Sequence, residues 1–385
     1  MKKFIYFCGM MLLCLNMMAQ IDLNDRNWDT VFYDDFTTNR SWRPSDWYSI
    51  PDLYWKAHPS NKVTHGNLEF QIYQYDHCLF DLTNEMIKLV AEYDVYDSIK
   101  YHHYALPDTM HGHYPNTYGQ NDGLYYFSGE IDSNSKFRYG LFEIRCRLPI
   151  HQGTFPAFWL YSSNGNGDDK YYEEIDIFEY TWSIAETPNH INNPSPHGIP
   201  DYYTITTGIY FSDTSIHYSS FARNFPTLPE TGTDLSHWHT YSCEWLPEKV
   251  VWYCDGQVIN EYYEVQNIPH RPLTLKTNYA INRHYKHDGT IWQGPESMDI
   301  DYIRVCQLKW DCDTDEVIAC QSDLDSFDYA VKKTITITST VGQPIVSNTD
   351  KITFRVNDSF TVTGPFEVDN GAEFTVLMQD CPENK

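Results

Sequence analysis

Residues 173–180 carry the side chains that could do chemistry. Glu174, Asp176 and Glu179 stand at positions i, i+2 and i+5, separated by large apolar residues that favour a strand. Side chains alternate along a strand, so Glu174 and Asp176 point to one side while strict alternation turns Glu179 to the other. One extra residue near positions 177–178, a β-bulge, would restore its direction, and bulges are common beside active sites. We therefore expect all three carboxylates to line one face.

Two carboxylates at close quarters are the groups that glycoside hydrolysis uses. One attacks the anomeric carbon while the other protonates the leaving oxygen, and a retaining enzyme holds the two about 5–5.5 Å apart. On a flat strand the α-carbons of the two glutamates lie ~13 Å apart, so bending and inward-leaning side chains must close the distance. Asp176 between them could raise the pKa of a neighbour and share a proton with it. Spacing alone also fits a solvated acidic edge strand.

Four other groups of residues surround this stretch in the sequence. They are SGEIDSNSKFRYGLFEIR at 128–145, GTFPAFWL at 153–160, the hairpin pattern HWHTYSCEW and VWYCDG at 237–245 and 251–256, and IDYIRV at 300–305. Together with Glu-Ile-Asp-Ile-Phe-Glu they resemble, in order, the motifs of glycoside hydrolase family 16 in its bulged version. The resemblance covers about residues 28–308. It implies a concanavalin A-like jelly-roll β-sandwich with a concave substrate cleft.

The resemblance also implies roles for the three carboxylates. By it, Glu174 is the nucleophile, Asp176 the assisting carboxylate and Glu179 the acid/base, and none departs from the family pattern. It further turns Trp159 toward the cleft, where an aromatic face could stack on a sugar.

Two further residues are candidates for substrate binding, and two for a metal. Trp182 could stack on a sugar or simply pack at a strand end, and Arg138 could bond sugar hydroxyls, although a surface ion pair is the commoner role. Hydrolysis of this kind requires no cofactor. Asp35 and Asp301 resemble family positions of a structural calcium, but two carboxylates do not define such a site.

Residues 1–19 are predicted to be a secretory signal peptide. A basic start and an apolar run too short to span a bilayer precede a small residue, Ala19. Lipidation of Cys14 is less favoured, because Leu13 stands where that signal requires a small residue. We therefore expect a secreted protein, extracellular or periplasmic, with no transmembrane segment.

The net charge of the chain limits the kinds of molecule that it is expected to bind. Without the predicted signal peptide the basic count falls from 27 to 25 against 53 acidic residues, so the formal net charge moves from −26 to −28. Such a surface repels nucleic acid and anionic membranes, and it disfavours a strongly anionic polymer. A neutral β-glucan is therefore slightly favoured. The unusual loops at 93–124 and 183–203 keep agar-, porphyran- and carrageenan-type galactans open as substrates.

Strand density and the scarcity of helical periodicity predict an all-β chain. We expect the catalytic sandwich at residues 20–310, a polar linker at 310–316 and a small β module at 311–385, with strands at 333–338, 352–356, 360–362 and 374–377. Cys243 and Cys254 fall on one face of the 237–256 hairpin pattern, where they either form a disulfide or simply pack.

These patterns predict a monomeric, secreted, endo-acting retaining hydrolase of β-1,3- or β-1,4-linked polysaccharide. A P-loop, a dinucleotide-binding glycine pattern, G-x-S-x-G and H-E-x-x-H are all absent from the sequence, which argues against the classes that use them. Two alternatives stay open: a non-catalytic carbohydrate-binding protein on the same sandwich, and a transglycosylase that rejoins chains.

Overall fold

The computed structural model describes most of the chain outside its amino terminus and several loops. The described residues are 27–38, 42, 54–57, 62–63, 71–93, 126–150, 153–163, 172–184, 201–212, 218–226, 234–281 and 294–382, in part as backbone only. The predicted signal peptide lies outside them, and so do most residues of the unusual loops at 93–124 and 183–203.

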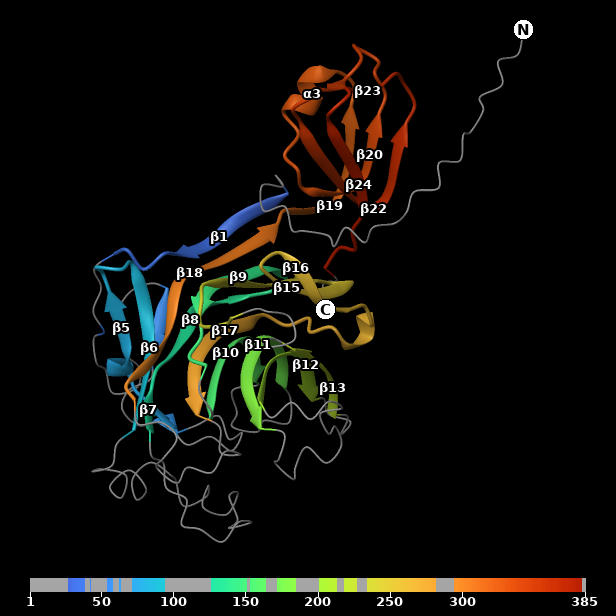
Figure 1. The fold of residues 1–385 in the computed structure, drawn as a ribbon. Helices are drawn as coiled ribbons and strands as arrows, with labels where there is room; N and C mark the ends of the chain where they lie inside the picture. Colours follow the sequence, from blue (N-terminus) through green and yellow to red (C-terminus); the bar gives the residue numbers. More distant parts are fainter. Residues whose placement is uncertain are drawn as a thin grey trace.

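Two large sheets make up the sandwich (Figure 1). Over the described residues the larger sheet has eleven strands: β1 (Trp28–Asp34), β3 (Lys62–Val63), β4 (Gln71–Tyr73), β5 (Cys78–Asp81), β6 (Met86–Tyr93), β7 (Tyr126–Ser128), β9 (Gly140–Arg147), β14 (His239–Leu246), β15 (Lys249–Cys254), β16 (Gln257–Tyr262) and β18 (Glu296–Leu308). Its order is β16-β15-β14-β9-β18-β6-β7-β4-β3, with β1 paired to β18 and β5 to β6. Two short 3₁₀ helices are described: η1 (Tyr75–His77) lies between β4 and β5, and η3 (Val265–Asn267) follows β16 where the chain passes to the second sheet.

The second sheet has seven described strands and is antiparallel throughout. They are β2 (Trp55–Ala57), β8 (Glu130–Phe137), β10 (Thr154–Ser163), β11 (Tyr172–Ile184), β12 (Asp201–Ser212), β13 (Tyr218–Pro226) and β17 (Leu273–Ile281), in the order β13-β12-β11-β10-β17-β8-β2. One buried core joins the two sheets, with Phe142 and Ile303 from the larger one and Phe158 and Ile175 from the smaller one. The all-β sandwich predicted from the sequence is confirmed.

A tight turn carries the chain from the smaller sheet to the larger one. Tyr139 (φ 58°) and Gly140 (φ 138°) both have positive φ between β8 and β9. A Cβ on Gly140 would lie 2.6 Å from the Cys306 carbonyl oxygen, so only glycine fits there. This turn fixes how β8, a strand of the site described below, sits against the sandwich.

The C-terminal part forms its own sheets and its own core (Figure 1, orange to red). Its elements are β19 (Trp310–Ile318), α3 (Gln321–Asp325), β20 (Val331–Ile337), β21 (Ile345–Val346), β22 (Lys351–Val362), β23 (Glu367–Val368) and β24 (Glu373–Met378). The strands pair in parallel, in a four-stranded sheet β19-β20-β22-β24 and a two-stranded sheet β21-β23. All four predicted strand segments are found, two of them as parts of the single strand β22.

The predicted polar linker at 310–316 is wrong. These residues form most of β19, and Lys309 alone separates β19 from β18. Alternating charged residues suggested a solvated connection, but alternation also suits a strand with one exposed side, and pairing with β20 satisfies its backbone.

The module also packs against the sandwich. Leu246 and Leu308 of the sandwich meet Val331 of the module in a small buried cluster. The Gln379 amide donates to Glu248 Oε2 at 2.8 Å across the same boundary.

The structure settles the cysteine alternatives for the described residues. Cys243 and Cys254 form no disulfide and pack in the core. Cys312 and Cys381 are bonded to each other, joining β19 to the end of the module. None of the described helices is long and apolar enough to cross a membrane.

Replacing Cys312 with serine should destabilise the module and leave the sandwich intact. The disulfide spans 69 residues of sequence, and losing such a crosslink costs roughly 2–4 kcal/mol of unfolding free energy. Differential scanning calorimetry should show a transition at lower temperature. Cys320→Ser, which removes a free thiol of the same module, is the control. Equal melting curves for the two variants would contradict the prediction.

Candidate active site

Strand β11 carries the three predicted carboxylates, and its register contains the predicted bulge. Asp176 lies opposite Gly208 of β12, and Glu179 lies opposite Thr206. Two residues of β11 therefore face one residue of β12, and the pairing with β10 shifts at the same place. The extra residue reverses the alternation between Asp176 and Glu179.

Burial on either side of the bulge shows which way each side chain points. Ile175, Ile177, Phe178 and Tyr180 all belong to the core between the sheets. The intervening Glu174, Asp176 and Glu179 therefore point to the opposite side of the smaller sheet. We call this side, which carries these three residues, the carboxylate face.

The larger sheet supports the bulge from behind. The indole N–H of Trp252 on β15 donates to the backbone carbonyl of Asp176 at 2.8 Å, and the Phe178 ring lies 4.6 Å from that of Tyr241 on β14. A bulge interrupts the ladder, and a buried carbonyl without a partner is costly. A side chain of the opposite sheet thus satisfies the backbone at the point where the alternation reverses.

The three carboxylates share a buried environment. Asp176 is only 2% exposed, and burial first, then the charges of Glu179 and Glu174, raise its pKa well above the ordinary range. Burial and the charge of Glu179 raise the pKa of Glu174 to about 8. Asp176 and Glu179 also share a hydrogen bond. Three negative charges this close are unfavourable, so the cluster keeps at least one proton near neutral pH.

Directly opposed residues place further side chains on the carboxylate face. Across β11, β10, β17 and β8, one row reads Asp176, Trp159, Lys276, Asp132, and the next reads Glu179, Ala157, Asn278, Glu130. Opposed residues of antiparallel strands point to the same side. Trp159 therefore lies on the same side of the smaller sheet as Asp176, and its contact with a sugar stays a prediction.

The sequence analysis missed four residues of this face: Lys276, Asn278, Glu130 and Asp132. Glu130 and Asp132 show the i, i+2 spacing of one strand face inside residues 128–145, and Lys276 and Asn278 show it in β17. That spacing gives the face of each strand, but it does not reveal which strand lies beside which.

The other two predicted binding residues are placed differently. Arg138 lies in the turn after β8, where its guanidinium is 5.0 Å from the Tyr139 ring centre and its carbonyl accepts from Gln307 of the larger sheet. It stands outside the two rows. Trp182 belongs to β11 opposite Tyr203, and its side chain lies outside the described residues. Substrate binding by either residue stays a prediction.

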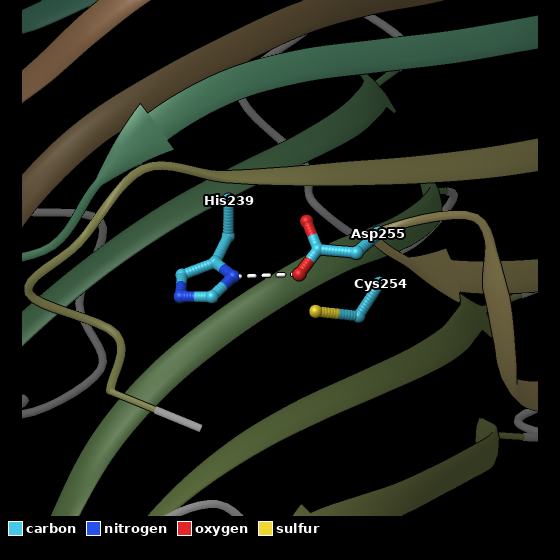
Figure 2. A group of neighbouring side chains, drawn as sticks. All are labelled: His239, Cys254 and Asp255. Carbon is cyan, nitrogen blue, oxygen red and sulfur yellow. Dashed lines mark hydrogen bonds and ion pairs between the residues drawn. The ribbon is translucent and has the colours of Figure 1, made fainter. Parts of the chain in front are cut away.

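One cluster of possible metal ligands occurs among the described residues, at the base of the β14–β15 pair (Figure 2). His239, Cys254 and Asp255 bring their ligand atoms within 4.8 Å of one another. His239 already bonds Asp255 Oδ2 through Nδ1 at 2.7 Å and the Asp234 carbonyl through Nε2 at 3.0 Å. Asp255 also accepts from the Thr240 amide. Both ring nitrogens are used in bonds that tie the strand ends together, so we interpret the cluster as structural.

The calcium considered at Asp35 and Asp301 finds little support. Asp301 is ion-paired with Arg145, and Asp35 accepts from the amide and hydroxyl of Thr37. A calcium site needs six to eight oxygen ligands, and these two carboxylates are already bonded elsewhere. A structural calcium at these two residues stays a prediction.

The family of the chain follows from comparison with known proteins. The model of glycosyl hydrolases family 16 matches residues 108–304, which contain the carboxylate strand and both rows. The chain belongs to this family.

Curated relatives match over part of their length. The endo-1,3-1,4-beta-glycanase EglC of Rhizobium meliloti is 30% identical over 194 residues, 50% of this chain and 36% of that protein. The kappa-carrageenase of Pseudoalteromonas carrageenovora is 27% identical over 200 residues, 48% of this chain and 47% of that protein. The chain therefore spans about half or less of the length of these two relatives.

Solved structures agree with the fold. One is the laminarinase catalytic domain of Thermotoga maritima, with a TM-score of 0.50 and 22% identity over 73% of this chain and 98% of that one. Another comes from work on endo-acting O-glycanases of human gut bacteria that initiate mucin breakdown, with a TM-score of 0.53 and 20% identity over 74% and 92%. These likenesses support the jelly-roll sandwich.

The raised pKa of Glu174 predicts a stability that falls as pH rises. The folded protein holds this proton up to about pH 8, whereas an ordinary glutamate releases it near 4.5, so the unfolding free energy decreases between these values. Glu174→Gln cannot ionise. We expect it to lose less stability over this interval and to exceed the wild type at pH 8 by at least about 1 kcal/mol.

Urea unfolding at several pH values would measure this difference. Glu261→Gln, which changes an exposed glutamate of β16, is the matched control and should follow the wild type. If Glu174→Gln also follows the wild-type curve, the carboxylates are not coupled as described.

Proposed function

We propose that this protein is an endo-acting retaining glycoside hydrolase of a β-linked polysaccharide. The observation that carries the proposal is the bulge that turns Glu174, Asp176 and Glu179 to one face of a sheet. Repulsion among the three carboxylates destabilises the folded protein. A reaction that needs one carboxylate charged and another protonated explains why the chain nevertheless holds them together.

In the proposed first step, Glu174 attacks the anomeric carbon while Glu179 gives its proton to the leaving oxygen. The glycosidic C–O bond breaks as the bond from carbon to the Glu174 oxygen forms. In the second step Glu179, now a carboxylate, takes a proton from water, whose oxygen attacks the same carbon and releases Glu174. The anomeric configuration is inverted twice and therefore retained.

Asp176 is proposed to assist by sharing a proton with Glu179. Its hydrogen bond to Glu179 and its near-complete burial support this role, because a proton shared by that pair stays available to Glu179. The raised pKa of Glu174 means that this residue must release its own proton before it attacks. Glu179 then has a proton to give when the leaving oxygen gains charge.

A neutral β-glucan is the slightly favoured substrate. On the described carboxylate face, the five carboxylates outnumber the three lysines Lys56, Lys136 and Lys276, so a sulfated polymer would meet net repulsion. The names of the relatives include a beta-glycanase and a kappa-carrageenase, so an agar-, porphyran- or carrageenan-type galactan is the main competitor. The proposed cleavage is at β-1,3 or β-1,4 linkages.

The remaining features of the proposal come from the sequence. We propose a secreted monomer that requires no cofactor, with a signal peptide at 1–19, the catalytic sandwich at 20–310 and a structural module at 311–385. The surface-lipoprotein route through Cys14 is the less favoured form of export.

Glu174→Gln should abolish turnover while leaving the fold intact. We expect reducing-end release to fall by about 10³-fold or more, because the variant keeps the shape of the side chain and loses the nucleophile. The assay compares laminarin, mixed-linkage glucan, agarose, porphyran and carrageenan, with Glu261→Gln as the control that retains activity.

Three outcomes would change this proposal. Wild-type turnover in Glu174→Gln would remove the nucleophile assignment. Binding without release from every polymer would favour a carbohydrate-binding protein. Longer chains without new reducing ends would favour a transglycosylase.

Azide should separate the roles of the two glutamates. With an aryl β-glycoside of the oligosaccharide that is cleaved, Glu179→Ala still forms the covalent intermediate, and azide should then yield the β-glycosyl azide. Glu174→Ala leaves room for azide to attack directly, which should yield the α-glycosyl azide. The anomeric proton coupling in NMR distinguishes these products. The reverse pairing would exchange the two roles.

A further inference from the structure

Lys276 is the buried cation of the carboxylate face. It lies on β17 between Trp159 of β10 and Asp132 of β8, in the row that begins with Asp176. Its side chain is 7% exposed. Its ammonium lies 3.3 Å from Glu130 Oε1 and also bonds Asp132 Oδ1. The chain therefore keeps a full positive charge one strand beyond Trp159.

The charge of Lys276 persists in this buried place. Burial alone would lower the pKa of the ammonium, but Asp132 and Glu130 outweigh it and raise that pKa. Such an ion cluster is a poor source of stability, because desolvation consumes most of the attraction and a well-packed apolar residue often serves as well. What the ammonium touches is then the better guide to its role.

The ammonium touches the aromatic ring of the site. Lys276 Nζ lies 5.3 Å from the centre of the Trp159 ring, within the range of a cation–π interaction. The indole N–H of Trp159 donates to Asn278 Oδ1 at 2.8 Å, and the Asn278 amide donates to the Tyr73 hydroxyl at 2.8 Å. The Tyr161 ring lies 5.6 Å away on the same strand. Trp159 is thus held at its N–H and at its ring.

We propose that Lys276 is a positioning residue: anchored by Glu130 and Asp132, it fixes the indole of Trp159 opposite Asp176 and so sets how a sugar ring next to the scissile bond is held. This inference rests on the proposed function. Both residues are largely buried, with Trp159 9% and Lys276 6% exposed, and Lys276 acts through its contact with the Trp159 ring. A displacement of about 1 Å beside reacting groups can cost 10²-fold in rate, so a loosened indole should be visible in turnover.

The module provides a matched control for Lys276. Lys332, whose side chain is 4% exposed, bonds Asp311 at 2.7 Å and Asp328 at 3.1 Å. Its ammonium lies 6.0 Å from the Phe327 ring centre. A third carboxylate, Glu316, lies 3.5 Å from the same ammonium. Lys332→Met therefore removes a buried cation that is also held by carboxylates beside an aromatic ring, away from the carboxylate face.

The test follows Trp159 directly. In protein labelled with 5-fluorotryptophan, the signal missing from Trp159→Phe identifies Trp159 among the 11 tryptophans. Lys276→Met should shift or broaden that signal and lower kcat/KM by at least about 10-fold. Lys276→Arg, which keeps a cation able to pair with both carboxylates, should restore part of each. Lys332→Met should change neither.

A second measurement separates this inference from the proposed function. Polymer binding to Glu174→Gln, which needs no turnover, should weaken at least 3-fold when Lys276→Met is added. If the wild type releases no product but this loss of binding appears, the hydrolase proposal fails and the positioning role stands.

An unchanged Trp159 signal, or a changed signal with unaltered kcat/KM and binding, would overturn the positioning role. If Lys276→Met does not fold, Asp132→Asn, which removes one anchor, is judged by the same signals.

Discussion

The site depends on one extra residue in β11. The bulge between Asp176 and Glu179 turns three acidic side chains to the same side, while every apolar neighbour stays in the core. Without it, the strand could bury its apolar residues only by sending Glu179 into the sandwich. The larger sheet stabilises the bulge through the bond from Trp252 to the Asp176 carbonyl. A local break in the ladder therefore depends on contacts between the two sheets.

Several features of the carboxylate face reduce the repulsion among its acidic side chains. Burial and the neighbouring carboxylates raise the pKa of Asp176 and of Glu174, so the cluster keeps a proton, and Asp176 and Glu179 share a hydrogen bond. Two strands away, Lys276 supplies a positive charge whose own anchors are acidic. The face therefore stays acidic in total, and this balance sets its proton content.

The sequence predicted what depends on local alternation and missed what depends on partners far along the chain. The parity of Glu174, Asp176 and Glu179 against the apolar residues was enough to place the bulge. The sequence did not predict the row from Asp176 to Asp132. Lys276 bonds a carboxylate 144 residues away, and the register that brings the two together is set by the whole sheet. The same limit explains the error at 310–316: alternating charges fit a linker or a strand until the neighbour β20 is known.

The passage of β18 into β19 has a mechanical consequence. A single residue, Lys309, separates a central strand of the larger sheet from the first strand of the module. The buried cluster around Leu308 and the hydrogen bond from Gln379 to Glu248 add contacts between the module and the sandwich. These contacts restrict bending of the chain at Lys309. A force on the module would therefore be carried along β18 into the middle of the sandwich.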